Sequence, residues 1–285
     1  MKPLTTMRIP HVGKLIAGCW AAAEDGVREK VRALYPDRDE EFITGLLHGE
    51  LALNFDKVSR AGTVAKAFLS DLELVFPTIT LDSLCRIAQG LIATVSFHPR
   101  EIEGKTGGDL GIVVIRPDVQ GMRFSGQYLT VDHDYRRGLL CQAKIFRRNS
   151  RWKGLSSNQQ RTLLGKLSYF GLLLYRYADQ EADRRNLKPF AWQLAHEATI
   201  QQIQSWFASD CFPDPLNSRQ VIQALINGKI GTDDKELIGK DIAPRLRRSL
   251  TITIRWKDGD DPGNRVRVQE RPTTVHLKQE VVVRR

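Results

Sequence analysis

The chain lacks the sequence features that identify several common protein classes. Its 285 residues contain four cysteines that lie far apart and form no CxxC pair. Structural zinc and a disulfide framework are therefore both poorly supported, and a reducing cytoplasm fits this cysteine usage best. No apolar run approaches the roughly 20 residues that a membrane-spanning helix needs. Residues 1–26 carry only a short apolar stretch, broken by Pro10, Gly13 and Lys14, so we interpret them as folded protein rather than a signal peptide.

Acidic residues are fewer than basic ones. The chain has 33 Asp and Glu against 43 Lys and Arg, a formal net charge of +10 and a pI near 9.6. Such a balance favours a polyanionic partner, because basic side chains that neutralise phosphates release bound counterions. A basic but inert surface is the alternative. The 41% hydrophobic and 27% charged content is ordinary for a globular protein with a packed core.

The hydrophobic pattern divides the chain into four parts: a helical region over residues 1–90, a strand-rich core over 91–185, a helical region over 186–248 and a small β-rich segment over 249–285. Helices are expected over 37–55, 61–76, 81–95, 156–179, 191–210 and 218–231. Strands are expected over 94–104, 109–117, 126–131, 137–146 and 249–256. The last strand alternates apolar and polar residues, which is typical of a half-buried strand. The pattern predicts an α/β protein with a mixed sheet flanked by helices.

Polar side chains interrupt two apolar strands of the expected core. In "KTGGDLGIVV", a pair of glycines delivers Asp109 to the start of a strand. In "LLCQAKIF", Gln142 and Lys144 are two residues apart, so both leave the same face of the strand, while Cys141 and Ala143 face the other way. A lysine on an apolar strand is costly to bury without an anionic partner, and Asp109 is the obvious one.

A third polar residue lies on the expected helix over 37–55. Glu50 falls at helical spacing from Leu46, Leu47 and Leu53, on the face expected to meet the core, which makes it a second candidate partner for the lysine.

Each of these residues also has a purely structural explanation. An acid after two glycines is a common turn residue. Gln142 and Lys144 also suit the solvated polar face of an edge strand. The basic run "KIFRRNSRWK" is also compatible with a solvated helix start, and Trp152 within it with either base stacking or packing.

Taken together, the helix-borne Glu, the Asp on a strand after a glycine turn and the Gln-x-Lys on a later strand resemble the PD-(D/E)xK nuclease superfamily, the restriction-endonuclease-like enzymes. The resemblance covers roughly residues 40–180. It is to the branch with Gln in the third position, similar to Mrr-type restriction enzymes and to predicted anti-phage effectors. It implies a restriction-endonuclease-like sheet with the nuclease core over residues 91–185. The sequence between Asp109 and Gln142 is long, so a hairpin or an extra strand is expected there.

The resemblance also implies roles for the residues. Asp109 would bind Mg²⁺ or Mn²⁺ directly, Gln142 would offer its carbonyl oxygen to the metal, Lys144 would orient or help deprotonate the attacking water, and Glu50 would complete the shell. Because Gln removes one negative charge, Glu101 and Glu103 are candidates to compensate, and we name Glu103 as a metal ligand. The basic run would contact the nucleic-acid backbone without reading sequence; its members are Arg147, Arg148, Arg151 and Lys153.

The resemblance therefore implies a metal-dependent deoxyribonuclease, and the cysteine usage favours the cytoplasm. A role in bacterial defence against foreign DNA, and action as a homo-oligomer or with partner proteins, follow from family analogy. RNA is the alternative substrate. One alternative function is a non-catalytic nucleic-acid-binding or regulatory module on a degenerate nuclease fold. Another is a scaffold subunit of a multi-protein system that docks through residues 249–256.

Overall fold

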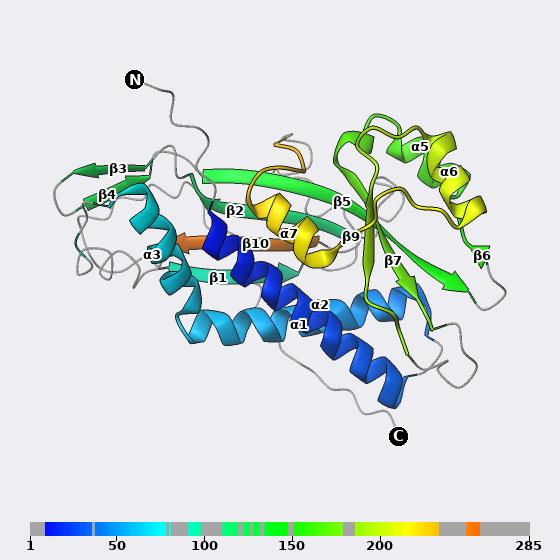
Figure 1. Cartoon of the computed structure of the whole chain (residues 1–285), viewed down its shortest axis with the longest axis horizontal. Helices are drawn as coiled ribbons and strands as arrows, with labels where there is room; N and C mark the ends of the chain where they lie inside the picture. The colour runs from blue at the N-terminus through cyan, green and yellow to red at the C-terminus, as the bar shows by residue number, and fades with distance from the viewer. Residues whose placement is uncertain are drawn as a thin grey trace.

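The structure is a computed structural model that describes residues 9–35, 38–77, 80, 91–97, 110–118, 122–125, 128–131, 134–147, 151–178, 186–233 and 249–256. Within these ranges the chain is a mixed α/β protein (Figure 1). The helices are α1 (Pro10–Leu34), α2 (Glu40–Arg60), α3 (Thr63–Val75), α5 (Ser157–Leu163), the 3-10 helix η2 (Leu167–Tyr169), α6 (Ile200–Ser209) and α7 (Ser218–Ile226). The strands are β1 (Leu91–Phe97), β2 (Leu110–Pro117), β3 (Met122–Ser125), β4 (Tyr128–Val131), β5 (Asp134–Arg147), β6 (Arg151–Trp152), β7 (Phe170–Arg176), β8 (Ala191–Leu194), β9 (Leu216–Asn217) and β10 (Ser249–Trp256).

The described strands form an eight-stranded mixed sheet in the order β1-β10-β2-β5-β7-β8-β9, with β6 paired to β5. Strands β2 and β5 are antiparallel, whereas β5 and β7 are parallel and are connected through α5. The remaining two strands, β3 and β4, form a separate antiparallel hairpin between β2 and β5. This confirms the expected hairpin between Asp109 and Gln142.

Strand β10, near the C-terminal end of the chain, lies inside the sheet between β1 and β2. The alternation expected over residues 249–256 is confirmed, because Leu250, Ile252 and Ile254 are buried and Thr251 and Thr253 are only partly exposed. The apolar side chains of β10 belong to the core. They are therefore not a docking surface for a partner.

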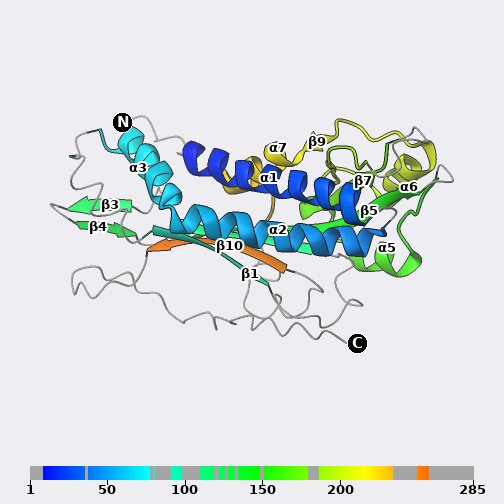
Figure 2. The same cartoon turned by 90° about the horizontal axis from the view of Figure 1, so that it is seen from below.

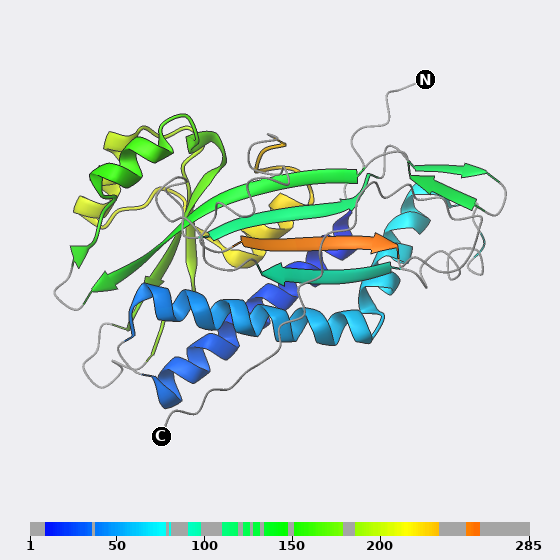
Figure 3. The same cartoon turned by 180° about the vertical axis from the view of Figure 1, so that it is seen from behind.

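Helices α1, α2, α3 and α7 cover one face of the sheet (Figure 2). The larger hydrophobic core lies between this helical layer and the sheet, and it includes Leu139, Cys141, Ala143 and Ile145 of β5. The opposite face, seen in Figure 3, carries a second, smaller core under α5 and α6. The side chains of β5 point alternately into the larger and the smaller core, so this strand separates the two cores.

Three helix predictions are wrong in part. The segment 156–179 is helical only in α5 and η2, and then forms the central strand β7. The apolar residues of β7 are buried on both faces, so they show no period of two, and Leu163, Leu167 and Phe170 imitate helical spacing. The segment 191–210 begins as strand β8 before α6. Residues 81–90 lie outside the described part, and strand β1 begins at Leu91.

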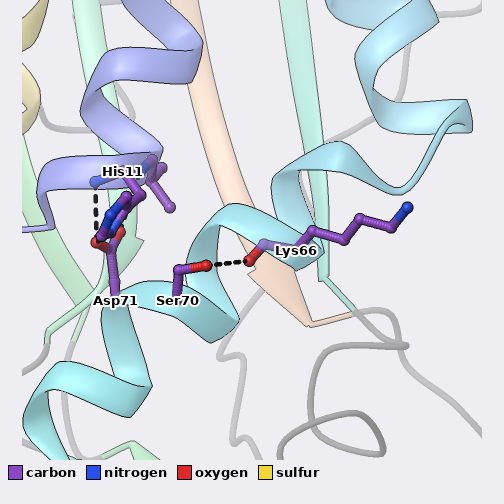
Figure 4. Close-up of polar contacts among 5 residues, drawn as sticks. His11, Lys66, Ser70 and Asp71 are labelled. Atoms are coloured by element: carbon purple, nitrogen blue, oxygen red, sulfur yellow. Dashed lines mark hydrogen bonds and ion pairs between the residues drawn. The ribbon is translucent and has the colours of Figure 1, made fainter.

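A carboxylate from one helix caps another. Asp71 of α3 is buried and accepts hydrogen bonds from the backbone N–H groups of His11 (2.9 Å) and Val12 (3.0 Å), in the first turn of α1. The His11 side chain contacts the same carboxylate, with Nδ1 2.7 Å from Oδ1 (Figure 4). Since the N-cap residue Ile9 has no side-chain acceptor, Asp71 satisfies donors that the helix itself leaves open.

We expect Asp71→Asn to lower the free energy of unfolding by about 1–2 kcal/mol, because one capping oxygen becomes an N–H₂ group that faces backbone N–H donors. Urea unfolding followed by circular dichroism measures this change. The control is Ser70→Ala, which removes an exposed hydroxyl that only bonds the Lys66 carbonyl of its own helix. Equal losses in the two variants would contradict the capping role.

A second buried acid lies between α1 and α7. Glu24 accepts a hydrogen bond from Trp20 Nε1 at 3.0 Å and another from the hydroxyl of Ser218, which itself accepts from Trp192 Nε1 at 2.5 Å. Burial raises the pKa of Glu24 to about 7, although the hydrogen bonds from Ser218 and Trp20 favour its charged form. The folded protein therefore retains a proton on Glu24 in a pH range where the unfolded chain has lost it.

We expect the free energy of unfolding to fall by up to about 3 kcal/mol as pH rises from near 4.5 to near 7, because the folded state binds more protons over this window. In Glu24→Gln this part of the pH dependence disappears. Chemical unfolding at about pH 5 and about pH 8 measures it, with the exposed Glu29→Gln as the control that keeps the wild-type slope. A Glu24→Gln variant with the wild-type slope would contradict this account.

No helix in the described ranges combines the length and the hydropathy that are needed to cross a lipid bilayer.

Candidate active site

Gln142 and Lys144 lie on the central strand β5, on the face opposite the helical layer. Their neighbours in β7 on this face are Leu172 and Leu174, which belong to the smaller core. Both polar side chains are buried, with exposed fractions of 1% for Gln142 and 2% for Lys144. The alternative of a solvated edge strand is therefore wrong, since β5 lies between β2 and β7 and its polar pair is withdrawn from solvent.

A third side chain, Gln159 of α5, connects the pair. Its Nε2 donates to Gln142 Oε1 at 3.0 Å, and its Oε1 lies 3.5 Å from Lys144 Nζ. Gln159 is held at the start of α5 by a capping box, in which Ser156 N donates to Gln159 Oε1 at 3.0 Å and Gln159 N donates to Ser156 Oγ at 3.3 Å. Helix α5, which connects β5 to β7, thus begins beside the polar residues of β5.

Sequence reasoning missed Gln159. A signal was present in "SSNQ", where a Ser followed three residues later by Gln is the pattern of a capping box. That pattern predicts a helix start, but it does not show that the same amide reaches another strand.

Asp109, Glu101 and Glu103 lie outside the described residues. Leu110, which follows Asp109 in the sequence, pairs with Cys141, which precedes Gln142. The strand that starts directly after Asp109 therefore runs beside the strand that carries Gln142. Within the described ranges, no group of three or more His, Cys, Asp and Glu side chains is placed to hold a metal ion.

Glu50 lies elsewhere. The helix around it is confirmed as α2, but its side chain faces α1, where Oε1 is 2.5 Å from Lys30 Nζ. The carboxylate rests against Gly26, since a Cβ on that glycine would be only 2.6 Å from Glu50 Oε2. The sheet separates it from Gln142 and Lys144, which point to the other face. The structure therefore does not bring Glu50 into the predicted shell, because the polar side of α2 at this position meets α1 rather than the sheet.

The described residues of the basic run lie mostly in the paired strands β5 and β6, the β5–β6 hairpin, rather than in a helix start. Arg147 pairs with Arg151 across the hairpin, Lys153 is exposed, and Arg148 lies outside the described residues. Trp152 packs into the smaller core, with its ring 5.2 Å from that of Phe146. Its Nε1 donates to Asp210 Oδ1 at 2.7 Å. Of the two roles expected for Trp152, base stacking and packing, the structure shows packing.

Comparisons of the chain with protein-family models, with curated proteins and with solved structures find no significant match.

If Gln142 helps to bind a divalent ion, Glu50→Gln should leave that binding unchanged within about twofold, because the Glu50 carboxylate lies across the sheet and is paired with Lys30. Calorimetric titration with Mn²⁺ measures the affinity. Lys30→Gln removes the other partner of the pair and is the matched control. A tenfold or larger loss of affinity in Glu50→Gln alone would return Glu50 to the site.

Proposed function

We propose that the chain is a metal-dependent nuclease with a restriction-endonuclease-like site, which hydrolyses phosphodiester bonds of DNA. The observation that carries the proposal is the burial of Lys144 together with Gln142 on a central strand, with both side chains in contact with one amide. Burying an ammonium group is costly, so a fold that retains one on a core strand commonly uses it for chemistry.

The arrangement of strands is compatible with this proposal. Strands β2 and β5 are antiparallel neighbours, and their register sets Leu110 opposite Cys141. The resemblance assigns metal ligands to Asp109, just before β2, and to Gln142 on β5. A metal ion bound by both residues requires β2 and β5 to be neighbours, as they are in the sheet.

The residues suit the reaction. Carboxylate and carboxamide oxygens are ligands that Mg²⁺ accepts, and Gln142 supplies one such oxygen in the described part of the chain. When bound, the metal would neutralise the phosphate and lower the pKa of its water. Lys144 would position the attacking water and stabilise the additional negative charge of the transition state. Asp109 and Glu103 would supply the acidic ligands.

The charge of the chain suits a polyanionic substrate. A net charge of +10 favours nucleic acid over neutral ligands, and Lys153 is exposed beside the β5–β6 hairpin. Arg147, Arg148 and Arg151 of the basic run are the proposed contacts with the nucleic-acid backbone. Defence against foreign DNA is proposed on family analogy.

Supercoiled plasmid incubated with the protein and Mg²⁺ should be cleaved, and EDTA should abolish cleavage. Lys144→Met should lower the cleavage rate by at least about a hundredfold, because it keeps the buried stem and removes the charge near the reacting phosphate. Asp109→Asn should have a similar effect. The control is Lys14→Met on the exposed surface of α1. Circular dichroism confirms that each variant folds. Full cleavage by both site variants would contradict the assignment of Lys144 and Asp109 to the active site.

The second candidate is a nucleic-acid-binding module without catalysis. It is favoured by Gln142 itself, which stands where a carboxylate would add a negative charge to a metal site. Salt-dependent DNA binding by a wild-type protein that cleaves neither DNA nor RNA with Mg²⁺ or Mn²⁺ would establish this alternative.

A further inference from the structure

We propose that Gln159 is a positioning residue, which holds the Gln142 carboxamide with its oxygen toward α5, on the side where Lys144 is also bound. The catalytic consequence of this inference rests on the proposed nuclease function. The orientation itself is a property of the folded chain and is measured without any cleavage.

The orientation follows from hydrogen-bond logic that starts at the backbone. Ser156 N–H can only donate, so the Gln159 atom that it meets at 3.0 Å is the oxygen Oε1. The other end of the Gln159 amide is then Nε2, which can only donate, and it meets Gln142 at 3.0 Å. Gln142 must therefore present Oε1 to it. This leaves Gln142 Nε2 near the backbone carbonyl of Ala143, at 3.4 Å.

The same amide also contacts the lysine. Gln159 Oε1 has two lone pairs, so it accepts from Ser156 N and still faces Lys144 Nζ at 3.5 Å. One side chain thus fixes which atom of Gln142 is available as an oxygen ligand and also contacts the Lys144 ammonium group. A flipped Gln142 would present an N–H₂ group, which cannot bind a cation.

The fold contains matched controls for the capping role of Gln159. Helices α6 and α7 begin with the same kind of capping box, in which the glutamine is Gln202 and Gln220. In α6, Thr199 N donates to Gln202 Oε1 at 2.7 Å, which repeats the bond from Ser156 to Gln159. Gln202→Met therefore removes an equivalent cap without removing the donor to Gln142.

The test compares Gln159→Met, Gln159→Glu and Gln202→Met by NMR of the side-chain amide of Gln142, identified by its loss in Gln142→Met. We expect the Gln142 signals to shift in both Gln159 variants and to stay in place in Gln202→Met. Glu retains the capping box, so Gln159→Glu should keep the melting temperature within about 2 °C of wild type. Its carboxylate cannot donate to Gln142, so the Gln142 signals should still shift.

Activity is the second readout. In Gln159→Met, kcat for plasmid cleavage should fall by about 10- to 100-fold with KM for DNA nearly unchanged, as is typical when a residue that orients a ligand is lost. Gln202→Met should retain wild-type kcat. Unshifted Gln142 signals in both Gln159 variants would overturn the inference whether or not the protein cleaves DNA. If the Gln142 signals shift in the Gln159 variants but the wild-type protein does not cleave DNA, the orientation is supported and the nuclease proposal is rejected.

Discussion

The burial of a lysine on the middle strand of the sheet constrains the rest of the molecule. Strand β5 sends Leu139, Cys141 and Ala143 into the core beneath the helical layer, and it sends Gln142 and Lys144 to the other face. Because an ammonium group without hydrogen-bond partners is too costly to hide, the fold must bring polar groups to that face. Helix α5 supplies one of them through Gln159, whose own side chain is fixed at a capping box.

The surrounding sheet explains how such a face is kept rigid. Strand β10 comes from near the end of the chain and pairs with both β1 and β2, so β2 is held by β10 on one side and β5 on the other. On the helical side, Arg116 of β2 is buried, donates from Nε to the carbonyl of Ile226 at the end of α7, and lies over the ring of Tyr135. A cation at a helix C-terminus is stabilising. The strand that follows Asp109 is thereby tied to the helical layer.

Much of the fold could be predicted from local patterns. Helices α2, α3 and α7 follow from amphipathic spacing, strand β10 follows from alternation, and strands β2 and β5 follow from short apolar runs bounded by turn residues. Strand β7 could not be predicted, because it is buried on both faces and its leucines are good helix formers. The same-face placement of Gln142 and Lys144 followed from their spacing. The direction of Glu50 did not, because an amphipathic helix packed on both a sheet and another helix has two buried sides, and the sequence does not distinguish them. The contact between Gln159 and β5 could not be predicted either, because it depends on tertiary structure.

In the proposed site, Gln142 and Asp109 share a divalent ion beside Lys144. Anomalous X-ray diffraction from crystals grown with Mn²⁺ tests this arrangement. We expect a manganese peak in contact with Gln142 Oε1 and an Asp109 carboxylate oxygen, with Lys144 Nζ close by and Glu50 across the sheet. A peak elsewhere, or an Asp109 side chain directed away from Gln142 with no manganese bound, would contradict it.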